Sequence, residues 1–397
     1  MKKRKRGTME EEGKPTPAIP FKKQSCFFKY LSYWKELDTP HAIDCMHLEK
    51  NVFESTIGVL LDINTKTKDG LKSRLDLVNQ DIRTEIHPTP AAQSAKVDLP
   101  GASYNLMTDE KRDICQWLRG VKVPTGFCSN IKSLVSMKDL TLTSFNAHAC
   151  HVMLTVFLPI VIKAIEPEYV KTVITCLGYF FNFITQKVIN EAELLALKQF
   201  ITETLCQLEM CFPPSFFDIM PHLMMHMVDQ IQELGPVYLR EMWTYERFMS
   251  TLNRYVHNRA YPKGSMIEAY TTEEAINCCM KYIRDGNAIG LPVPVHEGRT
   301  MGMGCTGRKT DGKSAAQNSG VRYEGIDEAT GETKTYYGQI EEIWELDYGG
   351  ELQIPIFQCQ WVKPKAIVMD EYGLTTVELQ SVGYKDDQWV VANRVAQ

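Results

Sequence analysis

A succession of apolar segments in the middle of the chain most constrains the fold. Residues 140–165 and 169–188 are strongly apolar, and Pro159 is expected to kink or break the first of them. Residues 191–209 carry apolar side chains at helical spacing, namely Leu194, Leu195, Leu197, Ile201, Leu205 and Leu208. Helices with such faces bury them against one another, so we predict a mainly helical protein. The longest apolar runs are too short to span a bilayer, and we expect no membrane partner.

Two other parts of the chain differ from this helical section. Met46, Val52, Phe53, Ile57, Leu60 and Leu61 predict an earlier amphipathic helix within residues 27–61. After residue 326 the apolar period falls to two, which predicts a small C-terminal antiparallel β domain and makes the fold a multidomain α+β type. Residues 291–325 are rich in Gly, Ser and Lys, which is typical of a flexible linker.

Charge and cysteine content set limits on the class of protein. The net charge is -5, which by itself neither favours nor excludes nucleic acid, because local patches matter more than the sum. The 12 cysteines include no C-x-x-C pair, so we expect mostly reduced thiols of an intracellular protein. Residues 1–26 begin MKKRKR and predict a disordered tail, which is either a nuclear import signal or a solvated charged terminus.

Residues 211–270 contain the densest group of side chains that could bind metal ions or nucleic acid or take part in catalysis. His222 and His226 are four apart, so on a helix they share one face and could bind one zinc ion. Zinc would need further ligands, for which Cys206 and Cys211 are near in sequence. The alternative is two histidines with ordinary hydrogen-bond partners. Pro221 either lies in the first turn of a helix or kinks one that begins earlier.

A second pattern follows within the same stretch. Phe248, Met249, Leu252, Tyr255 and Val256 form one apolar stripe that predicts a core-facing helix side. Another side is basic, and Glu246 stands near the start of this helix. The basic residues Arg247, Arg254, Arg259 and Lys263 are candidates for DNA phosphate contacts, with Glu246 as a candidate Mg²⁺ ligand. The alternative is a solvated charged face with local ion pairs.

Long segments of the chain resemble a known family. They include HAIDCMHLEKNVFESTIGVLL, FCSNIKSLVSMKDLTLTSFNAHACHVMLTVFLPI, GPVYLREMWTYERFMSTLNRYVHNRAYPKGSMIEAY and YYGQIEEIWELDYGGELQIPIFQCQWV. Together they resemble the C-terminal part of a plant CACTA (En/Spm-type) transposase. The resemblance implies the end of a transposase-like domain at 27–100, a helical transposase-associated domain at 101–290 and a β-rich associated domain at 326–397.

The resemblance also implies roles for particular residues. Such transposases use an RNase H-like fold in which two Asp and one Glu hold divalent metal ions, while a Cys pair and a His pair bind zinc. The pattern places the zinc histidines at His222 and His226 and the catalytic Glu at Glu246. The family's two Asp residues and its Cys pair lie upstream of the segment resembling the start of this chain. We therefore expect an incomplete triad, and zinc and magnesium are candidate cofactors only.

Three functional hypotheses remain open from the sequence. The chain is a DNA-binding module derived from a transposable element, or an assembly module that meets another transposase copy or itself without DNA contact, or a fragment without selected function. We expect no small-molecule substrate. The basic N-terminus favours the nucleus, with the cytoplasm as the alternative.

The first prediction concerns catalysis. Because the resemblance leaves Glu246 without its two Asp partners, and one carboxylate cannot hold two metal ions, the purified chain should not cut DNA with Mg²⁺ or Mn²⁺. Incubation with labelled duplex DNA checks this. Metal-dependent cutting that Glu246→Ala abolishes would contradict it.

Overall fold

The computed structural model describes most of the chain outside its N-terminal tail and one long internal segment. The described residues are 28–64, 66–90, 97–125, 127–128, 130–143, 145–164, 167–280, 282, 308–313, 316–326, 332–347, 353–370, 372–384, 388–392 and 395–396. The predicted tail 1–26 lies outside them, as do residues 291–307 of the predicted linker. The chain divides into two units, residues 1–43 and residues 44–397.

The described part of the first unit is a short aromatic turn structure. Two 3₁₀ turns, η1 (Phe28–Tyr30) and η2 (Ser32–Glu36), bring Phe28 and Trp34 into a stack with ring centroids 4.0 Å apart. His41 packs edge-on against both rings. The Leu31 N–H donates to the Phe28 carbonyl and the Trp34 N–H to the Leu31 carbonyl, so these two turns are closed by bonds between near neighbours in sequence.

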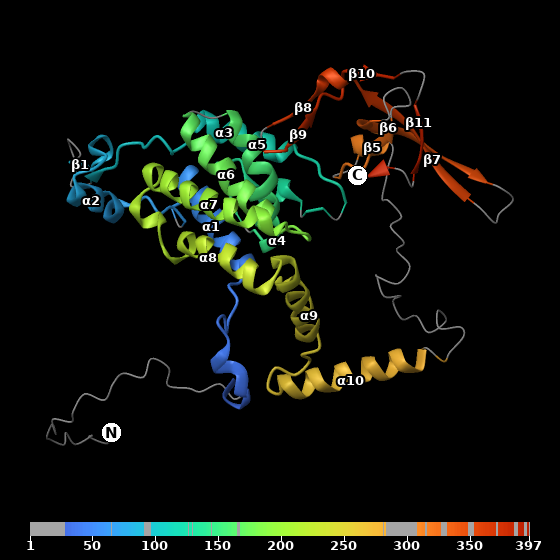
Figure 1. Cartoon of the computed structure of the whole chain (residues 1–397), viewed down its shortest axis with the longest axis horizontal. Helices are drawn as coiled ribbons and strands as arrows, with labels where there is room; N and C mark the ends of the chain where they lie inside the picture. Colours follow the sequence, from blue (N-terminus) through green and yellow to red (C-terminus); the bar gives the residue numbers. More distant parts are fainter. Residues whose placement is uncertain are drawn as a thin grey trace. The chain divides into compact units, whose positions relative to one another are not determined.

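The second unit begins with a bundle of helices (Figure 1). In chain order these are α1 (Cys45–Leu60), α2 (Leu71–Gln80), α3 (Thr108–Gly120), α4 (Ala147–Val152), α5 (Leu158–Val161), α6 (Glu168–Ile184), α7 (Glu191–Cys211), α8 (Ile219–Leu234), α9 (Trp243–Arg254) and α10 (Pro262–Met280). Short 3₁₀ turns join several of them: η3 (Thr84–Ile86), η4 (Ile131–Leu134), η6 (Ile162–Ala164), η7 (Pro214–Phe216) and η8 (Val237–Arg240). None of the described helices is long and apolar enough to cross a membrane.

The predicted apolar faces form the core of this bundle. Helix α1 packs against α4 and α8, and α7 packs against α6 and α8 (Figure 1). Phe53, Ile57, Phe180, Ile201 and Met224 are each at most 2% exposed, so most of the predicted apolar surface is buried. In the stripe predicted within residues 191–209, Leu194, Leu197, Ile201 and Leu208 are buried. The prediction was wrong for Leu195, which is 80% exposed because it lies about 100° around the helix from Leu194. The predicted helix within 27–61 is confirmed, and its regular part starts where the Asp44 side chain accepts a hydrogen bond from the His47 N–H.

The segment between α4 and α6 shows how Pro159 acts. A π-helical turn, η5 (Met153–Phe157), precedes α5, and η6 follows it. Proline has no N–H and its ring crowds the preceding turn, and the wider π-helical turn before Pro159 accommodates the ring, so that α5 passes through this position. The α-helical pattern is thus interrupted just before Pro159, in line with the predicted kink or break, and a kink of the helix axis stays a prediction.

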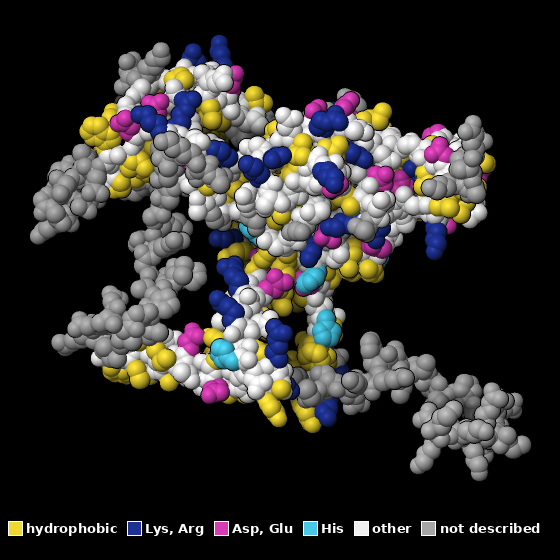
Figure 2. All heavy atoms as spheres, turned by 180° about the vertical axis from the view of Figure 1, so that it is seen from behind, with side chains coloured by type: hydrophobic (Ala, Val, Ile, Leu, Met, Phe, Trp, Pro, Cys, Tyr) yellow, Lys and Arg dark blue, Asp and Glu magenta, His cyan; other side chains and the backbone are white. Residues whose placement is uncertain are grey.

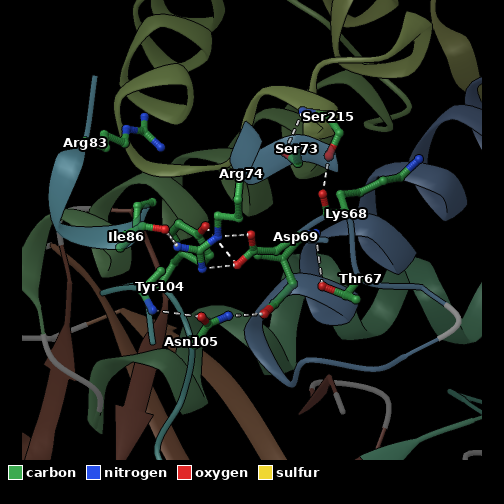
Figure 3. Close-up of polar contacts among 12 residues, drawn as sticks. Thr67, Lys68, Asp69, Ser73, Arg74, Arg83, Ile86, Tyr104, Asn105 and Ser215 are labelled. Carbon is green, nitrogen blue, oxygen red and sulfur yellow. Dashed lines mark hydrogen bonds and ion pairs between the residues drawn. The ribbon is translucent and has the colours of Figure 1, made fainter. Parts of the chain in front are cut away.

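A buried polar network ties the segment after α1 to the bundle (Figure 3). Arg74 is 2% exposed, and its guanidinium donates to both carboxylate oxygens of Asp69, at 2.5 and 2.6 Å. It also donates to the Ile86 carbonyl at 2.8 Å, and the Tyr104 hydroxyl donates to Asp69 at 3.0 Å. Each buried charge thus has partners. Removing one partner of a buried ion pair would destabilise the fold by about 3–5 kcal/mol. This network orders a polar segment that has little apolar content of its own.

The C-terminal part of the unit contains the β structure. After α11 (Arg308–Lys313) come β5 (Gly320–Ile326), β6 (Thr333–Asp347), β7 (Gln353–Val362), η10 (Pro364–Ala366), β8 (Ile367–Met369), β9 (Thr375–Val377), β10 (Val382–Gly383), β11 (Trp389–Val391) and β12 (Val395–Ala396). The main sheet has the order β10-β7-β6-β5-β12, and β11 also pairs with β7. The bundle contains two further short pairs, β1 (Thr89–Pro90) with β2 (Val97–Asp98) and β3 (Val135–Ser136) with β4 (Thr141–Leu142).

All pairings in the main sheet are antiparallel, and one of its faces is apolar. Tyr323 lies opposite Tyr336, and Ile343 lies opposite Phe357. A small core gathers Val321, Ile340, Phe357, Cys359, Trp361 and Ala392. The mainly helical fold with a C-terminal antiparallel sheet, predicted from the change of apolar period, is confirmed.

The second prediction concerns packing of α6 on the π-helical segment. A Cβ atom at Gly178 would lie 2.8 Å from the Leu154 carbonyl oxygen and 2.8 Å from Pro159 Cγ. Gly178→Ala should therefore lower the free energy of unfolding by about 1–3 kcal/mol, measured by urea denaturation. Gly264→Ala in α10 is the control, because no atom lies within 4 Å of its new Cβ. Equal stability of the two variants would contradict the close approach.

Candidate functional site

The histidine pair lies at the start of α8. Asp218 caps this helix by accepting a hydrogen bond from the Met220 N–H at 2.9 Å, and Pro221 lies in the first turn, where N–H groups have no intrahelical partner. His222 and His226 are exposed, with their Nε2 atoms 3.1 Å apart. The structure therefore brings the two predicted zinc ligands together.

The other ligands proposed for zinc do not complete a site in the described residues. Cys206 is exposed on α7, and Cys211, at the end of α7, is buried. Within the parts of the chain that the structure describes, no group of three or more His, Cys, Asp or Glu side chains could hold a metal ion. At 3.1 Å the two rings form a hydrogen bond in which one donates to the other. Zinc binding by His222 and His226 stays a prediction.

The predicted DNA-contact residues lie on α9, the loop after it and α10. Arg247 and Arg254 are on α9, Arg259 is in the loop, and Lys263 is at the start of α10. All four side chains are exposed, and so is Glu246 in the first turn of α9. Figure 2 shows Lys and Arg side chains beside hydrophobic ones on this part of the surface. Their roles in DNA and metal binding stay predictions.

The apolar stripe of α9 is not a core face in the described structure. No residue of α9 is buried, and Phe248 and Met249 are 47% and 63% exposed. The ring of Phe248 meets that of Tyr270 on α10 edge-on, with centroids 6.3 Å apart. The expectation of a buried side was therefore wrong. An amphipathic pattern shows that a helix has an apolar side, but it does not show what that side contacts.

A different cluster centres on a buried carboxylate. Glu49 on α1 is 3% exposed, and its Oε1 lies 2.8 Å from Nδ1 of His151 on α4. Helix α4 is positioned by Asn146, whose side chain accepts the Ala149 N–H at 2.7 Å. Burial opposes protonation of His151, but its hydrogen bond with Glu49 and the charges of Glu49 and Glu241 outweigh this and raise its pKa.

This pair borders a cavity of about 610 Å³. Cys45, Met46, Glu49, His148, His151, Thr185, Lys187, Tyr238, Glu241, Trp243 and Arg247 line it. Burial raises the pKa of Glu241 and the charge of Glu49 adds to this effect, whereas the charge of His151 and a hydrogen bond from the Trp243 side chain oppose it. Burial and the surrounding carboxylates also raise the pKa of Cys45, so its thiol stays neutral near pH 7.

The side chains that line the cavity suit ligand binding by a mixture of acidic, basic and aromatic groups. A neutral thiol is a poor nucleophile, which leaves carboxylates, imidazoles, cations and aromatic rings as the functional groups. The rings of His148 and Trp243 meet at 86° with centroids 5.5 Å apart, and the Lys187 ammonium lies 5.2 Å from the centre of the Tyr238 ring. Such a lining offers hydrogen-bond acceptors, cations and π faces to one ligand.

The sequence pointed to part of this cluster but grouped it differently. From the sequence alone, Asp44, His47 and Glu49 allow two interpretations, a metal or catalytic cluster or a helix start with acidic residues near its positive end. The structure shows the helix start: Asp44 caps α1 and its Oδ2 lies 2.7 Å from His47 Nδ1. Glu49 instead faces the core. The signal for this was a carboxylate inside the apolar stripe, three and four residues before Val52 and Phe53.

Comparison with known proteins identifies one domain. Residues 184–289 match DUF4218, a domain of unknown function that is associated with transposases. Neither curated proteins nor solved structures gave a match to the chain. The chain thus carries a transposase-associated DUF4218 domain, and this domain contains the histidine pair, Glu246 and the four basic candidates.

The cavity depends on more than this domain. Thr185, Lys187, Tyr238, Glu241, Trp243 and Arg247 belong to the matched segment, whereas Cys45, Met46, Glu49, His148 and His151 precede it in the chain. The upstream helices α1 and α4 supply the buried acid–histidine wall. A fragment limited to 184–289 would lack that wall.

The third prediction tests the Glu49–His151 pair by pH. A histidine whose folded pKa is raised contributes stability that is fully present below its ordinary pKa of 6.5 and is lost as pH rises through the raised value. Glu49→Gln should reduce this loss of stability, because an uncharged amide no longer raises the pKa of His151. Each unit of difference between the folded and unfolded pKa corresponds to about 1.4 kcal/mol. Urea denaturation from pH 6 to pH 9 measures it. Glu203→Gln, at an exposed position, should leave the pH dependence unchanged; an identical profile for both variants would contradict the pair's role.

Proposed function

We propose that the chain is a DNA-contact module derived from a CACTA-type transposase, and that α9 with the loop after it contacts the phosphate backbone. The observation that carries the proposal is a segregation of charge. Residues 247–263 contain four Lys and Arg residues and no Asp or Glu, and all four cations are exposed. The transposase-associated domain around this run supports a nucleic-acid partner.

The environment of these cations also supports phosphate contact. In the described part of the chain none of the four forms an ion pair, and Arg254 donates only a hydrogen bond to the Thr251 hydroxyl at 3.1 Å. A cation that forms no ion pair with a protein carboxylate keeps its charge available to an external anion. Phosphate contacts of this kind give affinity and position without reading sequence. The proposal therefore concerns DNA binding, and it does not depend on metal binding by Glu246 or on zinc at the histidine pair.

A second candidate function has its own observation. Helices α9 and α10 and the loop between them expose large apolar side chains, namely Tyr245, Phe248, Met249, Tyr261, Ile267, Tyr270 and Ile276. Contiguous exposed apolar surface favours a protein partner. An assembly module that binds another transposase copy or itself is consistent with this face. Light scattering of the wild type and of Phe248→Asp tests it, because a loss of self-association in the variant would support assembly.

The localisation that accompanies DNA binding is the nucleus, for which the basic N-terminal residues would serve as the import signal. Those residues lie outside the described structure, so this part of the proposal rests on the sequence. Imaging of a fluorescent fusion with and without residues 1–26 distinguishes it from the cytoplasmic alternative.

The fourth prediction concerns salt dependence of DNA binding. Each phosphate contact contributes about 0.9 to the slope of log affinity against log salt concentration for duplex DNA. Replacing Arg247, Arg254, Arg259 and Lys263 together with Ala should weaken binding and reduce this slope by up to about 3.6 units. Fluorescence anisotropy over a salt series measures both quantities.

A matched control removes the same charge elsewhere. Lys72, Arg119, Lys132 and Lys365 are exposed and lie outside α9 and α10. Their replacement with Ala should leave the slope close to the wild-type value. If both quadruple variants lower the slope equally, the chain attracts DNA through its general charge and the assignment to α9 fails.

A further inference from the structure

We infer that the cavity between α1, α4 and the start of α9 accepts one unpaired nucleotide of a DNA strand held by residues 247–263. This rests on the proposed DNA contact and adds a second, specific element to it. The protein would hold the strand through its phosphates and receive a single base in the cavity.

The position of the cavity is the first argument. Trp243 and Arg247 both line it and both belong to α9. They are four residues apart, so they project from the same side of the helix. Arg247 is also the first cation of the basic run, and therefore the cavity adjoins the surface proposed to hold the phosphate backbone. A strand on that surface passes beside the opening.

The composition of the lining is the second argument. A nucleotide presents an anionic phosphate, a planar aromatic base and a polar base edge. Arg247 and Lys187 supply cations, while Trp243 and His148 meet at right angles and form an aromatic corner. Stacking of a base on an aromatic side chain contributes to binding whatever the base is. A purely cationic ligand would not explain the two cations, and a purely anionic one would not explain the two carboxylates.

The carboxylates supply a preference among bases. The Glu49 carboxylate already pairs with His151 at 2.8 Å. The Glu241 carboxylate accepts a hydrogen bond from the Trp243 side chain and has capacity for further hydrogen bonds from a ligand. A carboxylate has two oxygens and accepts several hydrogen bonds. The exocyclic amino groups of adenine, cytosine and guanine donate such bonds, whereas thymine has no amino group. A base with an amino group, such as adenine, should therefore be preferred over thymine.

The size of the cavity explains why the nucleotide must be unpaired. A volume of about 610 Å³ falls in the range of small-ligand sites and cannot admit a duplex. A paired base must leave its stack before it enters, which costs a few kcal/mol, and this cost is least where the base has no partner. A bulged nucleotide is therefore the preferred substrate for binding.

The experiment compares a duplex containing one unpaired adenosine with the fully paired duplex of the same sequence, using the full chain and fluorescence anisotropy. We expect the bulged duplex to bind about tenfold more tightly. Trp243→Leu should remove this preference, so that this variant binds the bulged and the paired duplex equally, whereas Trp243→Phe, which keeps an aromatic face, should retain it. Glu241→Gln should bring the affinities for bulged adenosine and bulged thymidine closer together.

Matched controls and a free nucleotide complete the test. Trp117→Leu, in another part of the bundle, should keep the preference, and thermal melts establish that each variant is folded. Equal affinity for the two duplexes, with the slope effect of the basic residues intact, overturns the nucleotide site but leaves the DNA contact standing. Absence of any duplex binding overturns both. Binding of free 2′-deoxyadenosine monophosphate as tightly as the bulged duplex shows a free nucleotide as the ligand and overturns the strand-held one.

Discussion

The buried carboxylate of Glu49 is the constraint on which the arrangement of the bundle around the cavity depends. Helix α1 is buried over most of its length, and at 3% exposure Glu49 cannot be solvated by bulk water. Its charge therefore requires a partner from another helix, which His151 on α4 supplies at 2.8 Å. Apolar packing allows helices to slide and rotate, but an ion pair of this kind fixes the register of α1 against α4. The same pair forms a wall of the cavity.

The polar segment that follows α1 is organised by the same principle. Asp69 and Arg74 are buried as a bidentate pair, and Tyr104 completes the coordination of Asp69. Arg83 extends the network by donating to the carbonyls of Cys211 and Phe212 at the end of α7. Two buried charge clusters thus hold segments that contribute little to the apolar core. Specific polar contacts, rather than hydrophobic area, determine where these segments lie.

The transposase-associated domain combines a rigid part with an exposed one. Its α7 and α8 pack into the bundle, whereas α9 and α10 bury no residue. Binding surfaces need exposed groups on a fixed scaffold, and the change from α8 to α9 provides this transition within one domain. The basic run, the apolar face and the opening of the cavity all occur at this transition, which is why both candidate functions are assigned to it.

The sequence by itself determined the fold class and the helix faces, because apolar periodicity reports local geometry and burial together. Met46, Phe53 and Leu208 were predicted at buried positions and lie there. It could not determine contacts between distant segments. Glu49 and His151 are 102 residues apart, and nothing local in either segment specifies the other. Only the tertiary structure showed that α9 presents its apolar stripe outward. An apolar stripe indicates that a helix side favours burial, but the packing of the whole chain decides whether another part of the same chain covers that side.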